Sequence, residues 1–298
     1  MTTNTTEIKS FGLDEATMVM EFNASVWTAR KLDKGVTDEV VTSKGAGSKG
    51  AARVNKSLMA GRTELTDIQH VVGAARTYIY ANTAPWSDAG QRWVPTTRLL
   101  KVDKRMQEFS VEYWAQVEAF IAIYPALISA QAMALGDMFN RSEYPPVAEI
   151  RRKFAFGYDF IPVPSTKDFR VSIPADAAAD LRARLENANN RRVENALGDI
   201  RKQMKEHLER MADRLITVTN KQGEPSQQRF HDTLVTSAYE LCDLIGDFNI
   251  TGDKDLAAMK QRLEGALAGA SAEDLRVDGD KREEVRKEVS ALLGAFSW

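Results

Sequence analysis

The stretch VENALGDIRKQMKEHLERMADRL, residues 193–215, decides the fold of the C-terminal part of the chain. Its apolar residues recur every three or four positions, at Val193, Leu197, Ile200, Met204, Leu208, Met211 and Leu215. That spacing sets them on one face of a helix and approaches a heptad seam with one stutter. The charged pattern around it extends over 176–219, which predicts one long helix whose apolar face packs against a partner.

A partner for this face follows a turn at 220–228. Apolar residues recur at helical spacing from Phe230 to Phe248, so an antiparallel helical hairpin is the economical arrangement. The alternative partner is a second subunit. Two further amphipathic helices are predicted over 254–268 and 280–296.

The preceding part of the chain is richer in aromatic residues and proline. Helical spacing predicts a helix or a helix pair over 51–80, with a break at Gly61, and one or two helices over 100–139. Residues 12–34 are ambiguous between helix and strand. Residues 158–174 alternate apolar and polar side chains but contain three prolines, which favours an edge strand or an extended arm.

The predicted fold is mainly α, with an aromatic-rich helical body, a short β-like segment, a long antiparallel helical hairpin and C-terminal helices. We expect a flexible tail at 1–10, the body at 11–174, and the hairpin with the C-terminal helices at 175–298. The change in composition near Pro174 sets the boundary between the last two.

Composition limits the classes of function. The net charge of −2 excludes a protein that coats nucleic acid with its whole surface, although charge can still gather locally. The single cysteine, Cys242, excludes an intramolecular disulfide and thiolate zinc clusters, and it fits a reducing compartment. The histidines lack the H-E-x-x-H spacing and no G-x-S-x-G elbow occurs, so we predict no enzyme, no metal site and no cofactor.

One stretch tests whether the chain is soluble. The 18 residues from Ala119 to Gly136 carry no charge, which is long enough for a membrane span. Ser129 and Gln131 interrupt the stretch, and acidic residues bracket it. We therefore interpret it as a helix of the core and predict no membrane partner.

The segment SKGAGSKGAARVNK, residues 43–56, resembles a phosphate-binding loop. Such a loop needs a lysine and a hydroxyl after its second conserved glycine, and Ala51 and Ala52 occupy those positions, so we exclude a nucleotide hydrolase. Residues 30–62 nevertheless carry eight Lys or Arg against three acids. The segment is therefore a candidate contact for the nucleic-acid backbone, through Lys44, Lys49, Arg53 and Lys56. The alternative is a flexible, solubilising loop.

The loop NTAPWSDAGQRWVPTTR, residues 82–98, holds two tryptophans and two arginines. In one interpretation Trp86 and Trp93 stack on bases while Arg92 and Arg98 bind phosphates. In the other, the tryptophans fill the core and an acidic residue pairs with Arg92.

The final residues, EVRKEVSALLGAFSW at 284–298, end a charged helix in an apolar tip. Exposed aromatic side chains form adhesive patches, so the tip either docks on the protein's own hairpin or inserts into a neighbouring subunit or partner. The candidate contact residues are Leu292, Phe296 and Trp298.

Four segments resemble a family of tailed-phage and prophage proteins that carry a domain of unknown function. They are TARKLD (28–33), GAARVNKSL (50–58), TAPWSDAGQRWVP (83–95) and IPVPSTKDFRV (161–171). The similarity extends over about residues 25–215, and the family offers no catalytic residues. Its genes lie near those of MoxR-like AAA+ ATPases and of von Willebrand-type proteins. The resemblance therefore implies an accessory role in an ATPase-driven assembly in the bacterial host cytoplasm.

From these features we predict a non-enzymatic, phage-type protein that forms homo-oligomers and contacts single-stranded nucleic acid through its basic segment. The alternative is a structural shell, filament or adaptor protein that binds only protein. In that case an AAA+ ATPase or a von Willebrand-type protein is the expected partner.

Overall fold

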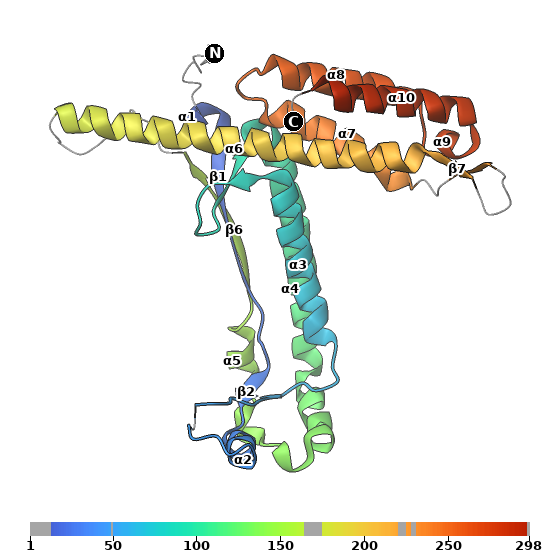
Figure 1. The fold of residues 1–298 in the computed structure, drawn as a ribbon. Coiled ribbons are helices and arrows are strands. Elements are labelled where there is room, and N and C mark those ends of the chain that lie inside the picture. The colour runs from blue at the N-terminus through green and yellow to red at the C-terminus, as the bar shows by residue number, and fades with distance from the viewer. Residues whose placement is uncertain (1–12, 49, 164–174, 220–224, 228–230, 297–298) are drawn as a thin grey trace. The chain divides into compact units, whose positions relative to one another are not determined.

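The computed structural model describes residues 13–48, 50–163, 175–219, 225–227 and 231–296, and these are mainly helical, as the sequence predicts (Figure 1). The chain divides into two compact units. The bundle unit comprises Met1–Val19, Asn82–Leu99 and Phe160–Trp298, and the α3/α4 unit comprises Met20–Ala81 and Leu100–Asp159. This division differs from the single boundary expected near Pro174, because separate stretches of the chain build each unit. The tail expected at 1–10 lies outside the described residues.

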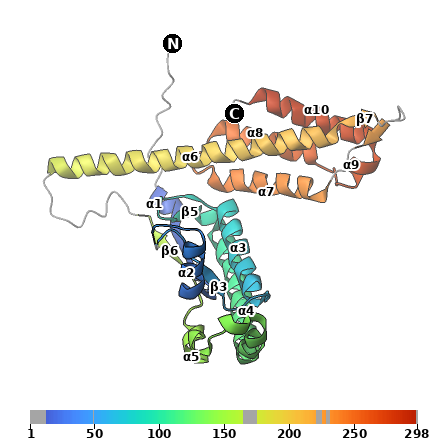
Figure 2. The same cartoon turned by 60° about the horizontal axis from the view of Figure 1, so that its bottom comes forward.

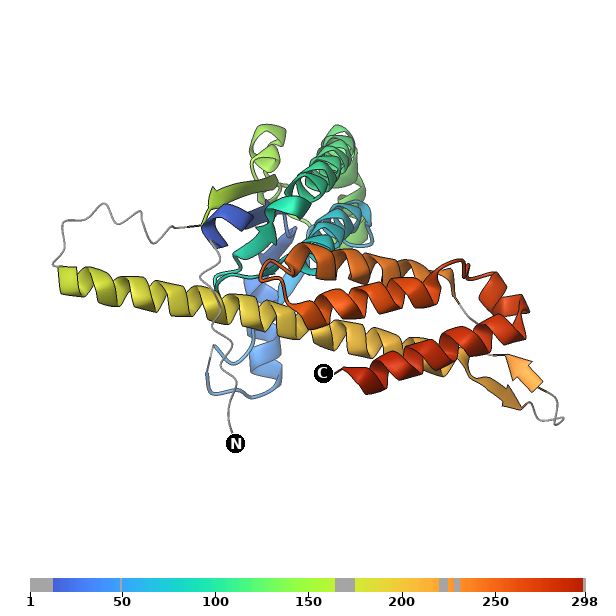
Figure 3. The ribbon, with the colours of Figure 1, turned by 90° about the horizontal axis from the view of Figure 1, so that it is seen from above.

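Four helices build the bundle unit: α6 (Ala175–Leu215), α7 (Asp232–Phe248), α8 (Lys254–Leu267) and α10 (Gly279–Ala295). Helices α6 and α8 each pack against both α7 and α10, so the four close around one apolar core (Figures 1 and 3). The seven seam residues of 193–215 are all buried in that core. The long helix, its return through α7 and the two C-terminal helices are therefore confirmed.

Polar groups fix the ends of these helices. Asp253 and Asp278 cap the first turns of α8 and α10, because their carboxylates accept hydrogen bonds from backbone N–H groups there. The buried guanidinium of Arg282 donates to the carbonyls of Leu215, at 3.0 Å, and Leu275, at 2.8 Å. Those carbonyls lie at the end of α6 and in the short helix α9 (Asp274–Val277), so one arginine satisfies acceptors from two helices.

Two short antiparallel strand pairs accompany the bundle. Strands β7 (Thr217–Thr219) and β8 (Pro225–Gln227) pair antiparallel between α6 and α7, and β4 (Ala84–Pro85) pairs antiparallel with β5 (Arg92–Pro95). Trp93 of β5 is fully buried, with its ring centroid 4.9 Å from that of Phe248 in α7. This aromatic contact explains why residues 82–99 belong to the bundle unit although the sequence places them in the N-terminal body.

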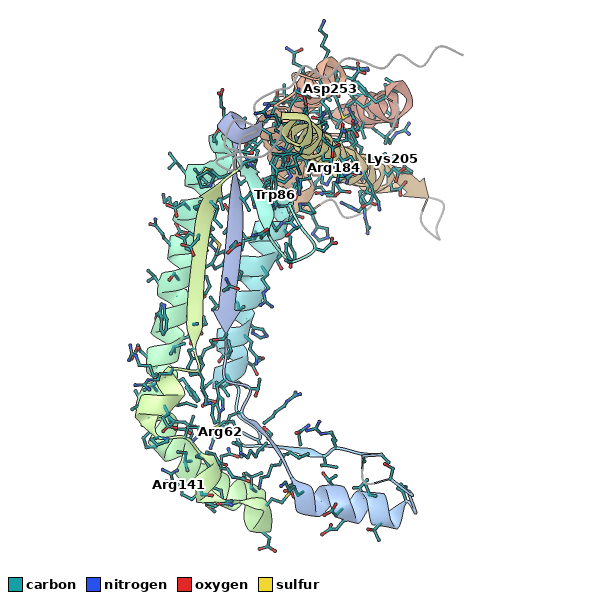
Figure 4. The ribbon with its side chains drawn as sticks, turned by 90° about the vertical axis from the view of Figure 1, so that its left-hand side faces the viewer. Arg62, Trp86, Arg141, Arg184, Lys205 and Asp253 are labelled. Atoms are coloured by element: carbon teal, nitrogen blue, oxygen red, sulfur yellow. The ribbon has the colours of Figure 1, made fainter. Side chains whose placement is uncertain are left out.

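In the α3/α4 unit, α3 (Glu64–Asn82) and α4 (Thr96–Leu135) lie side by side (Figures 1 and 2). Strands β1 (Thr17–Ser25) and β6 (Ala155–Pro162) run along one side of this helix pair (Figure 4). Strand β6 lies at the edge of its sheet, beside β1, as the proline-rich pattern predicts. The remainder of the predicted arm, 164–174, lies outside the described residues.

Aromatic side chains fill the space between these strands and helices. The ring of Trp27 lies 5.8 Å from that of Tyr124, and the ring of Phe120 lies 5.8 Å from that of Phe154. Tyr113 is fully buried and donates its hydroxyl hydrogen to the carbonyl of Ser25 at 2.6 Å, which joins α4 to β1. The aromatic side chains of the predicted body thus form a hydrophobic core of their own, separate from the core of the bundle.

The α3/α4 unit also contains the short elements β2 (Arg30–Leu32), α2 (Lys34–Ser43), β3 (Asn55–Ser57) and α5 (Val147–Arg151), whereas α1 (Leu13–Ala16), which precedes β1, belongs to the bundle unit. The helix predicted over 51–80 begins only at Glu64, so its first part is corrected. Residues 55–57 pair with β2, and Gly61 adopts a left-handed φ of 70°, which interrupts a helix.

Candidate nucleic-acid interface

The basic segment folds into a compact motif of β2, α2 and β3. The antiparallel register sets Lys31 opposite Lys56. Helix α2 packs back on β3, because the Asp33 N–H donates to the Val54 carbonyl at 2.9 Å and the Val54 N–H donates to the Thr37 hydroxyl at 3.1 Å. The carboxylate of Asp33 also caps the first turn of α2. These contacts hold the end of the glycine-rich stretch, at Val54, against the start of α2.

Lys56 is buried, so its predicted role as a nucleic-acid contact is corrected. Its Nζ lies 2.9 Å from the carboxylate of Glu143 and 3.7 Å from that of Asp33, and it donates to the carbonyl of Met138 at 2.7 Å. A buried ammonium needs such partners, because burying a charge without them costs far more than its contacts return. Lys56 therefore ties β3 to the start of α2 and to the short 3-10 turns at Gly136–Met138 and Arg141–Glu143.

The other cations of residues 30–62 that the structure describes are exposed, and we call them the basic surface: Arg30, Lys31, Lys34, Lys44, Arg53 and Arg62. None of these six forms an ion pair with another residue in the described part of the chain. The exposed acids in the same range are Asp38 and Glu39, which leaves an excess of four positive charges. Figure 4 marks Arg62 near the end of the unit that carries α2.

Two of the four lysines and arginines predicted for this segment, Lys44 and Arg53, belong to the basic surface. Lys49 lies outside the described residues. The prediction missed four residues of the surface as individual contacts: Arg30, Lys31, Lys34 and Arg62. The excess of positive charge over residues 30–62 could have identified them, because it extends well beyond the glycine-rich stretch.

The arginines of the 82–98 loop are held inside the bundle unit, so their predicted phosphate-binding role is corrected. Arg98 is buried, with its Nε 2.7 Å from the carboxylate of Asp247, and it donates to the side chain of Asn82 at 2.6 Å. Arg92 donates to the hydroxyl of Thr83 at 2.6 Å and to its carbonyl at 2.5 Å. Arg98 thus fastens the loop to α7, and Arg92 fastens one part of the loop to another.

The predicted base-stacking role of the tryptophans is corrected in the same way. The guanidinium of Arg192 lies 4.0 Å from the ring centroid of Trp86, and its Nε donates to the Trp86 carbonyl at 2.9 Å. This cation–π contact covers one face of the indole, and Trp86 is partly buried against the bundle core. Trp93 is fully buried in the core, as the core-filling interpretation of this loop predicts.

The C-terminal tip docks on its own bundle as far as the structure describes it. Leu292 is fully buried in the core, which corrects its assignment as a contact for another subunit. Phe296 is half-buried and packs against the same core, and the guanidinium of Arg262 lies 5.8 Å from its ring centroid. Trp298 lies outside the described residues.

Titratable groups offer no second site. No group of three or more His, Cys, Asp or Glu side chains is placed to hold a metal ion in the described ranges. Cys242 is buried in the bundle, and burial raises the pKa of its thiol to about 12. The thiol therefore stays protonated at neutral pH and is a poor nucleophile.

His207 is the one histidine buried in the described part of the bundle, and it should make stability depend on pH. Its Nε2 lies 2.9 Å from the carbonyl of Leu234, which accepts the hydrogen bond, and burial lowers the pKa of the ring. The unfolded chain, with a pKa of about 6.5, then binds protons more readily than the folded one. The free energy of unfolding should therefore be highest above a pH of about 6.5 and decrease as the pH falls below that value.

Urea unfolding at pH values of about 7.5 and 5.5, either side of that pKa, measures this effect. His207→Gln should flatten the pH dependence because the side chain no longer titrates. His231→Gln is the matched control, since His231 is exposed in the same unit and should leave the dependence unchanged. An equal pH dependence in the parent and in His207→Gln would contradict the assignment.

Helix α4 with the turn that follows it, Thr96–Met138, is long and apolar enough to cross a membrane. Its most apolar 18 residues have a mean hydropathy of 1.6, yet only 28% of that window is buried. The stretch 119–136 was predicted to be core, and a large part of it is instead open to solvent in the α3/α4 unit. One such helix is weak evidence for a membrane span.

Comparison of the chain with protein-family models, with curated proteins and with solved structures found no match. The resemblance to tailed-phage proteins therefore stays a prediction. The geometry of the chain's own residues carries the functional argument.

Proposed function

We propose that this protein is a non-enzymatic binding protein that contacts the phosphate backbone of nucleic acid through its basic surface. One observation carries the proposal: among the described residues of 30–62, six exposed cations that form no ion pair stand against two exposed acids. A cation that forms no ion pair within the protein can pair with a phosphate of nucleic acid. The release of counterions from the polyanion then favours binding.

The chemistry of this segment favours binding without sequence preference. Residues 30–62 contain no Phe, Tyr or Trp, so the segment offers no platform on which bases could stack. Lysine and arginine contacts to phosphates fix position but do not distinguish bases. We therefore expect similar behaviour with oligonucleotides of different sequence.

The second candidate function is a protein-only adaptor or structural subunit. The uncharged, exposed side of α4 over residues 119–136 favours it, because such a surface suits contact with protein. Partnership with an AAA+ ATPase or a von Willebrand-type protein rests on the phage resemblance alone.

Fluorescence anisotropy with labelled oligonucleotides, single-stranded and double-stranded, tests the proposal over a series of salt concentrations. The test variant replaces four residues of the basic surface with alanine: Lys31, Lys34, Lys44 and Arg53. For a single strand, the log–log slope of affinity against salt should flatten by about 3, because each phosphate contact contributes about 0.7. For a duplex the flattening should be larger, at about 0.9 for each contact.

The matched control removes the same number of charges from the bundle unit. It replaces four exposed cations with alanine: Lys202, Arg210, Lys254 and Lys287. Its salt slope should stay close to that of the parent. Equal flattening in both variants would show that only the overall charge matters, and absence of binding by the parent at about 50 mM salt would refute the proposal in favour of the adaptor.

A further inference from the structure

The exposed side of helix α4 is charged in its first half and uncharged in its second half. The exposed positions of its first half include the charged residues Lys101, Lys104, Arg105, Glu108, Glu112 and Glu118. From Ala119 to Gly136 no position carries a charge, and the side chains of Met133 and Ile123 are 91% and 42% exposed. A surface helix normally presents charged residues to water. The exposed, uncharged side of the second half is therefore typical of a surface that contacts another molecule.

Pro125, Ala132 and Ala134 are exposed in this half, and six further exposed residues, spaced mainly by three or four positions, share one side of the helix. We call them the α4 face: Ala119, Ala122, Ile123, Ala126, Ser129 and Met133. Most are small, so a partner can approach the helix backbone closely. Ile123 and Met133 are the large exceptions, and each needs a small side chain of the partner opposite it.

A lipid bilayer is a poor occupant for this face. On the other side of the same helix, the buried amide of Gln131 donates to the carbonyl of Ala60 and accepts from its N–H, both at 3.1 Å. Arg62 follows two residues later and is exposed. Immersion of this end of the unit in hydrocarbon would desolvate that charge at high cost, so the apolar face is one-sided.

We propose that the α4 face pairs with the same face of a second copy of this chain, antiparallel about a two-fold axis at Ala126. Met133 and Ala119 lie seven positions either side of Ala126, and Ile123 and Ser129 lie three either side. The pairing therefore sets each larger side chain against a small one of the second copy. A parallel pairing would set Met133 against Met133 and Ala119 against Ala119, which combines a clash with a void.

Charge does not oppose this pairing. The stretch itself has no charged residue, so the axis brings no like charges together. Two acids border it. Glu118 lies 2.6 Å from the guanidinium of Arg151 in the same unit and is thereby partly neutralised, and the antiparallel register keeps Asp137 far from Asp137 of the second copy. An isologous contact of this kind closes at two copies, because the same face is used on both.

The size of the contact sets its strength. Eighteen residues at a rise of about 1.5 Å give a contact about 27 Å long, with one helix from each copy. Such a contact falls below the roughly 800 Å² for each partner that is typical of stable complexes. We therefore expect a weak dimer with a dissociation constant of about 1 µM or higher. The dimer goes beyond nucleic-acid binding and does not depend on it.

Cysteine cross-linking tests the axis directly. The native Cys242 is buried, so an introduced cysteine is the accessible thiol. Ala126→Cys should form an intermolecular disulfide with an added copper–phenanthroline oxidant, because the two thiols meet on the axis. Val111→Cys is the control: Val111 is 72% exposed on the charged half of α4, away from the axis, so this variant should stay unlinked under the same oxidant.

The register has its own test. A mixture of Ala119→Cys and Met133→Cys, one of them carrying a mass tag, should cross-link each variant to the other. Neither variant alone should cross-link to itself, because the antiparallel register separates identical positions. Self-linking by each variant alone would overturn the antiparallel arrangement.

Sedimentation velocity over a concentration series gives the affinity. Ala126→Glu places like charges opposite each other on the axis and should raise the dissociation constant at least about tenfold. Its melting temperature should stay close to the parent's, because Ala126 is exposed in the monomer. A parent that stays monomeric at every concentration, with Ala126→Cys unlinked, would overturn the proposal. Flotation of a monomeric parent with neutral phosphatidylcholine vesicles, lost in Met133→Glu, would overturn it too and assign the face to a bilayer.

Discussion

Replacing Leu208 with aspartate is expected to unfold the bundle unit at room temperature. Leu208 is fully buried in the core on the seam of α6, between Met204 and Met211. Loss of the leucine contacts costs about 2–5 kcal/mol by analogy with large-to-small core substitutions. An unpaired carboxylate in the same place adds a penalty of similar size, about 2–7 kcal/mol. Together these terms approach the whole stability of a typical domain, about 5–15 kcal/mol.

Far-ultraviolet circular dichroism and amide hydrogen exchange across α6 and α7 measure this effect. The matched control is Gln203→Asp, which introduces the same side chain at an exposed position of the same helix and should change stability by about 0.5 kcal/mol or less. A Leu208→Asp variant that melts with the parent would show that this face of α6 does not belong to the core.

The seam of 193–215 was predictable because burial of one helix face leaves a signature that repeats within a few residues. The same logic correctly gave α7, α8 and α10. Residues 82–99 leave no such signature of the core that they join. Their place is fixed by contacts distant in sequence, such as that of Arg98 with Asp247, which are 149 residues apart.

Charge can be read from a sequence, but burial of a charge cannot. Arg92, Arg98 and Lys56 carry the positive charge that a phosphate contact needs, and each is engaged by acceptors within its own unit. Lys44 and Arg53 are exposed, as predicted, since the glycine-rich stretch between them brings no apolar side chain to cover them. The difference lies in acceptors such as Glu143, which lie far along the chain from the basic segment.

The apolar stretch of α4 shows a related limit. Hydropathy identifies residues that avoid water, but it does not say whether the same chain or another molecule covers them. Tyr124 and Ile128 face the unit's own core, as the periodicity predicts, whereas Ile123 and Met133 face outward. Hydropathy alone rates both sets as apolar, although they lie on different sides of the helix.

The second large effect is expected at Lys56. Lys56→Met removes the ammonium that lies between the carboxylates of Asp33 and Glu143, which retain only 15% and 17% of their side-chain exposure. Two poorly hydrated negative charges then remain without a cation, and breaking such a buried pair costs about 3–5 kcal/mol. We expect a loss near the lower end of that range, about 3 kcal/mol, because both carboxylates keep some contact with water.

Chemical denaturation followed by amide exchange over α2 and β3 measures this loss, and two further variants assign its cause. Lys56→Met combined with Glu143→Gln should recover part of the stability, because it removes one of the two stranded charges. Lys44→Met alters a lysine of the same basic segment that is exposed and has no ion pair, so its stability should match the parent's. If the segment acts as we propose, Lys44→Met should instead weaken oligonucleotide binding and lower the salt slope by about 0.7 for a single strand. A parent-like stability for Lys56→Met would mean that this lysine is not the internal anchor of the segment, and it would return Lys56 to the set of candidate phosphate contacts.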